Sequence, residues 1–324
     1  MTDATPLITV AICTYDRYEV LHECIEAVLA QDLPADQYEI MVVDNTAPTG
    51  TLGEKRAASA AKYADNPRVN YITVDTAGLS NARNVAATTS TAKYIAYIDD
   101  DAVAVPHWLS QLVAVFQKTG AGVVGGKAVP RFEIPRPSWL DDRITGYLSL
   151  VDLGPKIRQV EPHEYVAGVN VAFDREMLLD YGAFNINLGR QGSGSSNLLS
   201  NEELDLMNNL RAGGKKIYYC PTAEVEHCIP AGRLTRKWFR RRAAWQAISN
   251  QMKGSPDAET LTRTWDSVAA YLLQVPAQYR SLNGLTWDTD DAELFFLQIL
   301  AVENYTRLMI ATGELPLPMM AQVA

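Results

Sequence analysis

The chain has 324 residues and carries 29 lysines and arginines against 38 aspartates and glutamates, which gives a formal net charge of −9. This length suits one large α/β domain or two smaller ones, and a hydrophobic content of 47% supplies a sizeable core. The acidic balance excludes proteins that bind nucleic acid along its backbone, because such binding depends on many lysines and arginines. A local basic site remains compatible with it.

The cysteines and the first residues predict a cytoplasmic protein. Four cysteines, at positions 13, 24, 220 and 228, form no CxxC pair, which is typical of free thiols in a reducing compartment. The start of the chain has no basic n-region, so the apolar run Leu7–Cys13 is predicted to be a strand and not a signal peptide. Polar residues interrupt the apolar segment Leu294–Ala311, so we expect at most a peripheral protein at the inner face of the plasma membrane.

The first third of the chain alternates short apolar runs with helical patterns. The predicted strands are Leu7–Cys13, Tyr38–Val43, Val69–Val74, Tyr94–Ile98 and Gly122–Ala128. The predicted helices are Arg17–Gln31, Ser80–Thr91 and His107–Thr119. This alternation predicts an α/β fold with a Rossmann-like, mostly parallel sheet and helices on both faces. In such sheets, ligands bind at the carboxyl ends of the strands, where the strand order reverses.

The second half begins with a loose, proline-rich segment, 130–164, which we interpret as an insertion or a wall over the sheet. The predicted helices beyond it are Asp174–Tyr181, Ser200–Ala212, Leu234–Gln251, Ala258–Tyr279 and Asp290–Thr312. A short strand is predicted at Lys216–Cys220.

Polar residues follow three of the predicted strands: 14–17, 44–45 and 99–101. The adjacent carboxylates of Asp99, Asp100 and Asp101 repel one another, and a hard divalent cation such as Mg²⁺ or Mn²⁺ would neutralise them. Two other interpretations stay open. The triplet is also compatible with a solvated acidic turn, or with an aspartyl-phosphate phosphatase in which Asp99 is the nucleophile and 141–142 supplies a second acidic pair.

Taken in order, motifs over residues 6–250 resemble family 2 glycosyltransferases of the GT-A fold. The first-half motifs are Cys13-Thr14-Tyr15-Asp16-Arg17, Val43-Asp44-Asn45, Gly78 with Ala82-Arg83-Asn84, and Ile98-Asp99-Asp100-Asp101. The second-half motifs are Gly168–Phe173, Leu188-Gly189-Arg190, Leu199–Glu203, Glu226-His227 and Arg233-Leu234-Thr235. The resemblance implies a GT-A domain over 1–252, with a nucleotide-binding half (1–129) and an acceptor half (130–252), followed by a helical C-terminal extension (253–324).

The activity implied by this resemblance is inverting transfer of a sugar from a nucleotide-diphosphate donor to an acceptor hydroxyl. Family habit favours a UDP-sugar as donor and a polysaccharide or a lipid-linked glycan as acceptor, as in bacterial polysaccharide biosynthesis. The donor-binding residues would be Thr14, Tyr15, Arg17, Asp44, Gly78, Arg83, Asp99, Asp100 and Arg233. Asp101 and Asp99 would bind Mn²⁺ or Mg²⁺, with His227 closing over the metal or the diphosphate. The acceptor-binding residues would be Gly168, Asn170 and Glu202.

Glu203 occupies the position of the family's catalytic base. The family usually has Glu-Asp there, whereas this chain has Glu202-Glu203. A glutamate can abstract the same proton if it reaches the acceptor hydroxyl. Two alternatives remain: Ser200–Glu203 also fits a capping box at a helix N-terminus, and the departure from Glu-Asp is compatible with a catalytically silent nucleotide-sugar-binding or assembly subunit.

Three further features carry alternatives. His227 lies near Cys220 and Cys228 in the sequence, and these three residues are a possible zinc site. Their spacing matches no common zinc-binding pattern. The loop around Gly192-Ser193-Gly194 is either a lid over the donor or a connector. The basic segment Arg236–Arg242 is either a solvated helix face or a contact with anionic lipid headgroups, and Arg233 before it would reach the donor diphosphate.

Overall fold

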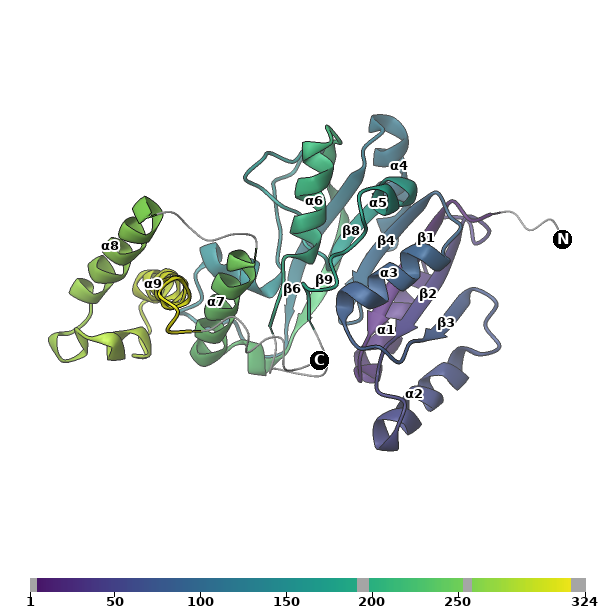
Figure 1. The fold of residues 1–324 in the computed structure, drawn as a ribbon. Helices are drawn as coiled ribbons and strands as arrows, with labels where there is room; N and C mark the ends of the chain where they lie inside the picture. The colour runs from purple at the N-terminus through teal and green to yellow at the C-terminus, as the bar shows by residue number, and fades with distance from the viewer. Residues whose placement is uncertain (1–4, 191–197, 253–257, 316–324) are drawn as a thin grey trace. The chain divides into compact units, whose positions relative to one another are not determined.

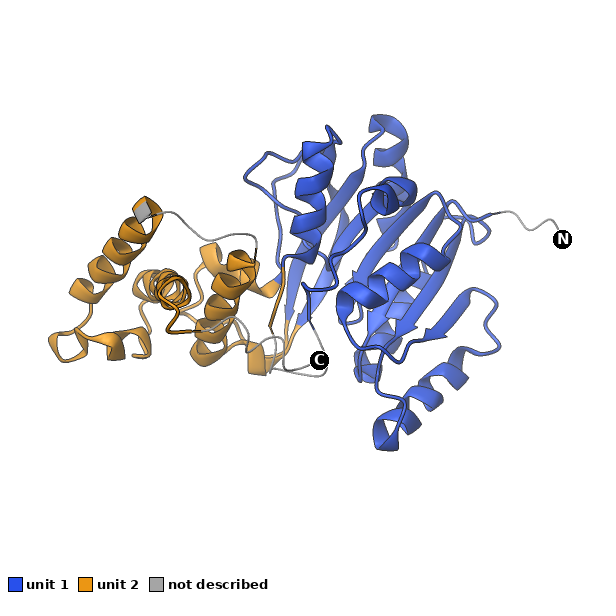
Figure 2. Cartoon of the chain, viewed as in Figure 1, with its two compact units in different colours: residues 1–131, 149–196, 201–228 blue, residues 132–148, 197–200, 229–324 orange. Residues whose placement is uncertain are grey.

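The computed structural model describes residues 5–190, 198–252 and 258–315 (Figure 1). The chain forms two compact units (Figure 2). Unit 1 comprises Met1–Arg131, Ser149–Ser196 and Asn201–Cys228, and unit 2 comprises Phe132–Leu148, Asn197–Ser200 and Ile229–Ala324. This division assigns the helix after residue 234 to unit 2, whereas the sequence-based division places it in the first domain.

The first half of the sheet in unit 1 is parallel. Its strands are β1 (Ile8–Thr14), β2 (Tyr38–Asp44), β3 (Val69–Thr73) and β4 (Tyr94–Asp99), in the order β3-β2-β1-β4. The residues of β1 and β4 are almost all buried, as expected for strands covered on both faces. The predicted strands of this half are confirmed within a residue or two.

Three helices connect these parallel strands: α1 (Tyr18–Leu29), α2 (Gly50–Tyr63) and α3 (Leu79–Thr89). The chain steps outward from β1 to β3 and then returns across the sheet to β4 through α3. Because such crossovers are right-handed, α3 covers the face opposite to α1 and α2. The strand order therefore reverses between β1 and β4, and their carboxyl ends form the switch point of the sheet.

The second half of the sheet is antiparallel. Strand β8 (Asn170–Asp174) pairs with β4 and with β6 (Val123–Phe132). Beyond them lie β9 (Ile217–Ile229), β5 (Ala102–Ala104) and β7 (Arg158–Gln159). The helices of this half are α4 (Trp108–Thr119), α5 (Arg175–Asp180) and α6 (Glu202–Ala212). Strand β9 continues well beyond the strand predicted at 216–220.

Unit 2 is mainly helical, with α7 (Arg236–Gln251), α8 (Ala258–Gln274) and α9 (Ala292–Ala311) as its long helices. Its short 3₁₀ turns are η1 (Asp142–Leu148), η2 (Ala231–Arg233), η3 (Ala277–Tyr279) and η4 (Leu282–Leu285). Helix α9 packs against both α7 and α8. Edge-to-face contacts of Trp139 with Phe239 and Phe295 join the segment before η1 to this core.

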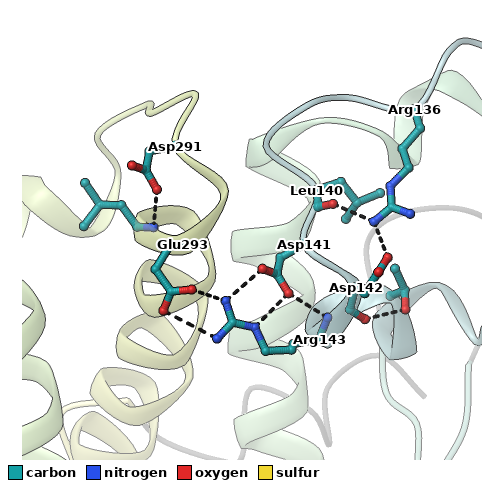
Figure 3. A network of polar contacts seen from close by, with 9 residues as sticks. Arg136, Leu140, Asp141, Asp142, Arg143, Asp291 and Glu293 are labelled. Atoms are coloured by element: carbon teal, nitrogen blue, oxygen red, sulfur yellow. Dashed lines mark hydrogen bonds and ion pairs between the residues drawn. The ribbon is translucent and has the colours of Figure 1, made fainter.

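A polar network fixes η1 on the start of α9 within unit 2 (Figure 3). The guanidinium of Arg143 donates to Asp141 at 2.8 Å and also pairs with Glu293, while its plane lies over the ring of Phe296. Asp291 caps α9 by accepting the backbone N–H of Leu294.

Helix α9 is also long and apolar enough to cross a membrane, judged by length and composition alone. A third of its apolar window is buried by the rest of the chain. The core helix of a soluble protein gives the same pattern, so this finding is weak evidence for a membrane span.

Candidate active site

The polar residues predicted at the strand ends meet at one edge of the sheet in unit 1. Cys13 lies opposite Asp99 across the β1–β4 pair, and Thr14 lies opposite Asp44 across the β1–β2 pair. Thr14 donates a hydrogen bond from its hydroxyl to Asp100 at 2.7 Å. The sequence prediction that these segments share a rim is therefore confirmed.

The acidic triplet is a buried cluster and not a solvated turn. The side chains of Asp100 and Asp101 are 5% and 1% exposed, while that of Asp99 is 31% exposed. Arg17 bridges the inner two: it lies 2.9 Å from Asp100 and pairs with Asp101 through its other amino group. Burial, reinforced by Asp101 and opposed by Arg17, raises the pKa of Asp100 to about 7.

A group that could hold a metal lies in this cluster. The ligand atoms of Asp99, Asp101 and His227 all lie within 4.8 Å of one another. Strand β9 supplies His227, which pairs with Ala102 on β5, and the neighbouring Cys228 N–H donates to the carbonyl of Asp101 at 2.8 Å. His227 Nε2 faces a carboxylate oxygen of Asp101 at 3.3 Å.

The chemistry of this donor set fits a hard divalent ion. Two carboxylates and one imidazole suit Mg²⁺ or Mn²⁺, and three protein ligands leave positions for phosphate oxygens. Neither Cys220 nor Cys228 belongs to the group found among the described residues, and both are free thiols. The residues therefore support the carboxylate-based metal site and not the zinc alternative.

Asp44 is placed at the rim but is enclosed by the protein. Its carboxylate is fully buried and accepts hydrogen bonds from the hydroxyls of Tyr18 at 2.9 Å and Tyr71 at 2.7 Å, and from the backbone N–H of Thr46. Tyr18 also lines a cavity of about 630 Å³ together with Arg17. The expected contact of Asp44 with the nucleotide stays a prediction.

Arg83 is the most connected cation of the site. Its side chain is 3% exposed and lies 2.9 Å from Glu202 and 3.4 Å from Asp99, and it donates to the carbonyl of Gly168 at 3.3 Å. A Cβ at Gly168 would lie 2.6 Å from the guanidinium, so a side chain there would force Arg83 to shift. Arg83 therefore joins the acidic triplet to the start of α6.

Gly78 precedes α3 with a φ of +129°, a conformation that favours glycine. Its carbonyl accepts a hydrogen bond from the side chain of Asn45 at 3.0 Å. Tyr15 is half-buried in the loop after β1. Asn45, Tyr18 and Tyr71 were not predicted as site residues. For Asn45 a signal existed, since it follows directly after Asp44.

Glu203 and Glu202 lie in the first turn of α6. Glu203 accepts the backbone N–H of Gly168 at 3.2 Å with one oxygen, and its other oxygen is buried without a hydrogen-bond partner in the described part of the chain. Glu202 is buried against Arg83. Burial, reinforced by Glu203 and opposed by Arg83, raises the pKa of Glu202 to about 7.

The capping-box interpretation of this segment is wrong. The N-cap residue of α6 is Asn201, in the left-handed conformation, and its side chain makes no cap hydrogen bond. Ser200 instead belongs to unit 2, where its hydroxyl accepts from Arg242 at 3.0 Å. Glu203 is therefore not held in the reciprocal bond that the capping box requires.

Asn170 supports the site from within the sheet. Its amide donates to the carbonyls of Lys127 and Ala223, and its oxygen accepts from the indole of Trp108 at 2.8 Å. The side chain is 1% exposed, so these bonds fix β8 against its neighbours. Its expected contact with the acceptor stays a prediction, as do those of Glu202 and Gly168.

Arg233 and the basic segment 236–242 belong to unit 2. Arg236 and Arg240 pair with Asp290 and Asp288, and Arg242 is buried with its guanidinium over the ring of Tyr147. Several of these cations are therefore neutralised inside the unit. The Gly192-Ser193-Gly194 loop lies outside the described residues.

The acidic pair of the phosphatase alternative has a structural role. Asp142 pairs with Arg136, and Asp141 with Arg143, in the network on η1 (Figure 3). Both aspartates are thus engaged by arginines within unit 2.

Comparisons with known proteins identify the family. Residues 9–182 match the family described as "Glycosyl transferase family 2". A glucosyl-dolichyl phosphate glucuronosyltransferase of Haloferax volcanii is 26% identical over 249 residues, which are 76% of each chain. The succinoglycan biosynthesis protein ExoM of Rhizobium meliloti is 25% identical over 274 residues, covering 83% of this chain and 82% of its own.

The fold has solved counterparts. A mannosyltransferase of Pyrobaculum calidifontis, PcManGT, in complex with GDP-Man and Mn²⁺, superposes with a TM-score of 0.61 at 18% identity and covers 95% of this chain and 88% of its own. At this identity, the likeness confirms the GT-A-like fold alone. The family match spans more than half of the chain and includes the rim of β1, β2 and β4, so this protein is a glycosyltransferase and belongs to glycosyl transferase family 2.

Proposed function

We propose that this enzyme transfers a sugar, with inversion, from a nucleotide-diphosphate donor to a hydroxyl of a polysaccharide or lipid-linked glycan. The observation that carries the proposal is the contact chain through Arg83. This residue touches Asp99 of the metal group and the carbonyl of Gly168, whose own N–H donates to Glu203. The residues for the donor and the residue for the acceptor proton are thus connected within unit 1.

Glu203 is the proposed base. Its second oxygen has no partner among the described residues, so it can accept a proton from an acceptor hydroxyl. The Gly168 N–H holds the first oxygen and orients the carboxylate. Removing the proton as the hydroxyl attacks the anomeric carbon from the side opposite to the diphosphate gives inversion in a single displacement.

Asp99, Asp101 and His227 would hold Mn²⁺ or Mg²⁺. When bound, the ion supplies positive charge for the diphosphate leaving group. Thr14 and Arg17 lie beside this group, and the cavity lined by Arg17 and Tyr18 is the space we assign to part of the donor. A UDP-sugar is the donor favoured by family habit.

A second part of the proposal is peripheral contact with a membrane. The relative from Haloferax volcanii is named for a dolichyl phosphate substrate, a lipid. Lys237 is an exposed cation of segment 236–242 that could meet anionic headgroups, whereas Arg236, Arg240 and Arg242 are engaged inside unit 2.

A donor-consumption assay tests the proposed function. The purified chain is incubated with UDP- and GDP-sugars and Mn²⁺, with and without glycan acceptors, and nucleoside diphosphate release is measured. The proposal predicts release that requires one donor class and increases with acceptor. A protein that binds a nucleotide but never releases sugar would instead be the silent subunit that the Glu202-Glu203 pair leaves open.

A further inference from the structure

Arg17 lies against the same carboxylate that the metal group uses. Its two amino groups contact Asp100 and Asp101, one each. Asp101 is also one of the three residues of the metal group. A guanidinium and a divalent ion therefore have a ligand in common.

The partners of Arg17 are fixed, whereas Arg17 itself is accessible. The side chains of Asp100 and Asp101 are 5% and 1% exposed, and Thr14 holds the second oxygen of Asp100. The side chain of Arg17 is 37% exposed. Arg17 is the N-cap residue of α1, and its side chain makes no capping hydrogen bond. The side chain can therefore move without loss of a helix cap.

There is also a space for the guanidinium to move into. The cavity of about 630 Å³ beside α1 is lined by Arg17 itself, together with Asp16, Tyr18 and Lys55. Asp16 faces this cavity and is paired with Lys55 at 2.9 Å, and the acidic residue Glu19 also lines the cavity. A displaced cation can remain near the rim and meet an anionic donor.

We propose that Arg17 is an exchangeable counter-cation of the Asp100–Asp101 pair, which the divalent ion displaces. Before the donor and the ion bind, Arg17 neutralises carboxylates that would otherwise repel one another in a buried place. With an ion held by Asp101, Arg17 would lose this partner and would be available to the diphosphate of the donor. This inference rests on the proposed function and adds that the chain opposes binding of the ion alone and favours binding of the ion with the donor.

The alternative role for Arg17 is fixed support of the metal ligand, as with the outer partners that hold ligands in many metal sites. The two roles predict opposite effects of removing Arg17 on the affinity for the ion. Removing a supporting residue weakens binding of the ion, whereas removing a competing cation strengthens it.

The test is a titration of the donor-free protein with Mn²⁺. Binding is measured by isothermal titration calorimetry and by the electron paramagnetic resonance signal of free Mn²⁺. Arg17→Met is expected to tighten Mn²⁺ binding by about fivefold or more, the lower end of typical coupling between linked interactions. Lys55→Met is the matched control: it removes a neighbouring cation that lies outside the metal group, and it should leave Mn²⁺ affinity near the wild-type value. Unchanged or weaker Mn²⁺ binding in Arg17→Met would overturn the inference.

Two further measurements keep the result interpretable. If Arg17→Met does not fold, Arg17→Gln carries the test in the same direction, because glutamine also removes the positive charge from Asp100 and Asp101 and keeps a polar side chain there. Asp101→Asn reports on the proposed function itself. If Mn²⁺ binding depends on Asp101 but is not tighter in Arg17→Met, only the exchange of Arg17 for the ion is overturned. If Mn²⁺ does not bind, or binds equally well to Asp101→Asn, both the exchange and the proposed metal-dependent function are overturned.

Discussion

Arg83 and Glu202 form an ion pair at 2.9 Å across 119 residues of sequence, with both side chains buried. The pair joins α3, from the parallel half of unit 1, to α6. The rings of Tyr97 and Phe184 lie within 6 Å of the guanidinium and shield it further. It therefore fixes the helix that carries Glu203.

Replacement of Arg83 by methionine should destabilise the protein strongly. Breaking a buried pair leaves the partner charge uncompensated, which costs about 3–5 kcal/mol. Denaturant unfolding of Arg83→Met, Glu202→Met and the double variant measures this cost. The double variant should recover part of the loss, since no unpaired charge then remains of the pair. Lys55→Met, which breaks an exposed pair with Asp16, should cost about 0–1 kcal/mol. Equal, additive losses in the double variant would show that the two side chains are not coupled.

Glu203→Gln should abolish most of the transfer activity while leaving the donor site intact. A positioned general base contributes about 10²–10⁴-fold, so kcat should fall within that range. Mn²⁺ affinity should be unchanged, because Glu203 is not in the metal group. Asp205→Asn, in the same turn of α6, is the control and should retain activity. Near-full transfer by Glu203→Gln would disprove the assignment of the base.

Stability should decrease as the pH rises from about 4.5 to about 7, a window set by the pKa of Glu202. Its pKa is near 4.5 in the unfolded chain and is raised to about 7 in the folded one. Within this window the folded protein holds a proton that the unfolded chain has released, so the free energy of unfolding falls with pH. Asp100, whose pKa is also raised to about 7, acts in the same direction.

Urea unfolding at pH 5 and pH 8 measures this dependence. Glu202→Gln should give a shallower fall in unfolding free energy than the wild type, because glutamine does not titrate. Glu176→Gln, at an exposed position of α5, is the matched control and should follow the wild type. A wild type whose stability rises steadily across this range would contradict the direction given for Glu202.

His227→Gln should weaken Mn²⁺ binding. Loss of residues that merely support a ligand typically costs about 10–100-fold in affinity, and loss of a ligand should cost at least as much. Calorimetric titration with Mn²⁺ measures the affinity, and chelation by EDTA should remove the nucleotide-dependent stabilisation of the wild type. His107→Gln, which changes a histidine outside the metal group, is the control. A variant at 227 with wild-type Mn²⁺ affinity would exclude His227 from the site.

The sequence predicted the parallel half of the sheet well, because strands such as Tyr94–Asp99 are continuous apolar runs. It missed α2, since the inward positions of that helix include Arg56 and Ser59 and blur the hydrophobic periodicity. It also shortened β9, although residues 223–229 alternate between buried and more exposed positions with the period of a strand. That alternation could have placed His227 on a strand facing the protein interior.

The sequence motifs named most residues of the candidate site, and the fold shows which of them are in contact. The family resemblance named Asp99, Asp101 and His227 as candidate ligands, and the structure brings these three side chains together. It could not show that Asp44 is enclosed by Tyr18 and Tyr71, or that Glu202 pairs with Arg83, because these contacts join residues far apart in the sequence. Long-range pairs of this kind depend on packing, which local pattern does not encode.

The rim of β1 and β4 is expected to bind a nucleoside diphosphate together with a divalent ion. A thermal-shift measurement with UDP and GDP, each with Mn²⁺ or with EDTA, tests it most directly, because a ligand that binds only the folded state raises the apparent stability. We expect at least one nucleotide to raise the Tm, and we expect this rise to require Mn²⁺ and to be lost in Asp101→Asn. The absence of any shift with either nucleotide, or an equal shift in Asp101→Asn, would contradict it.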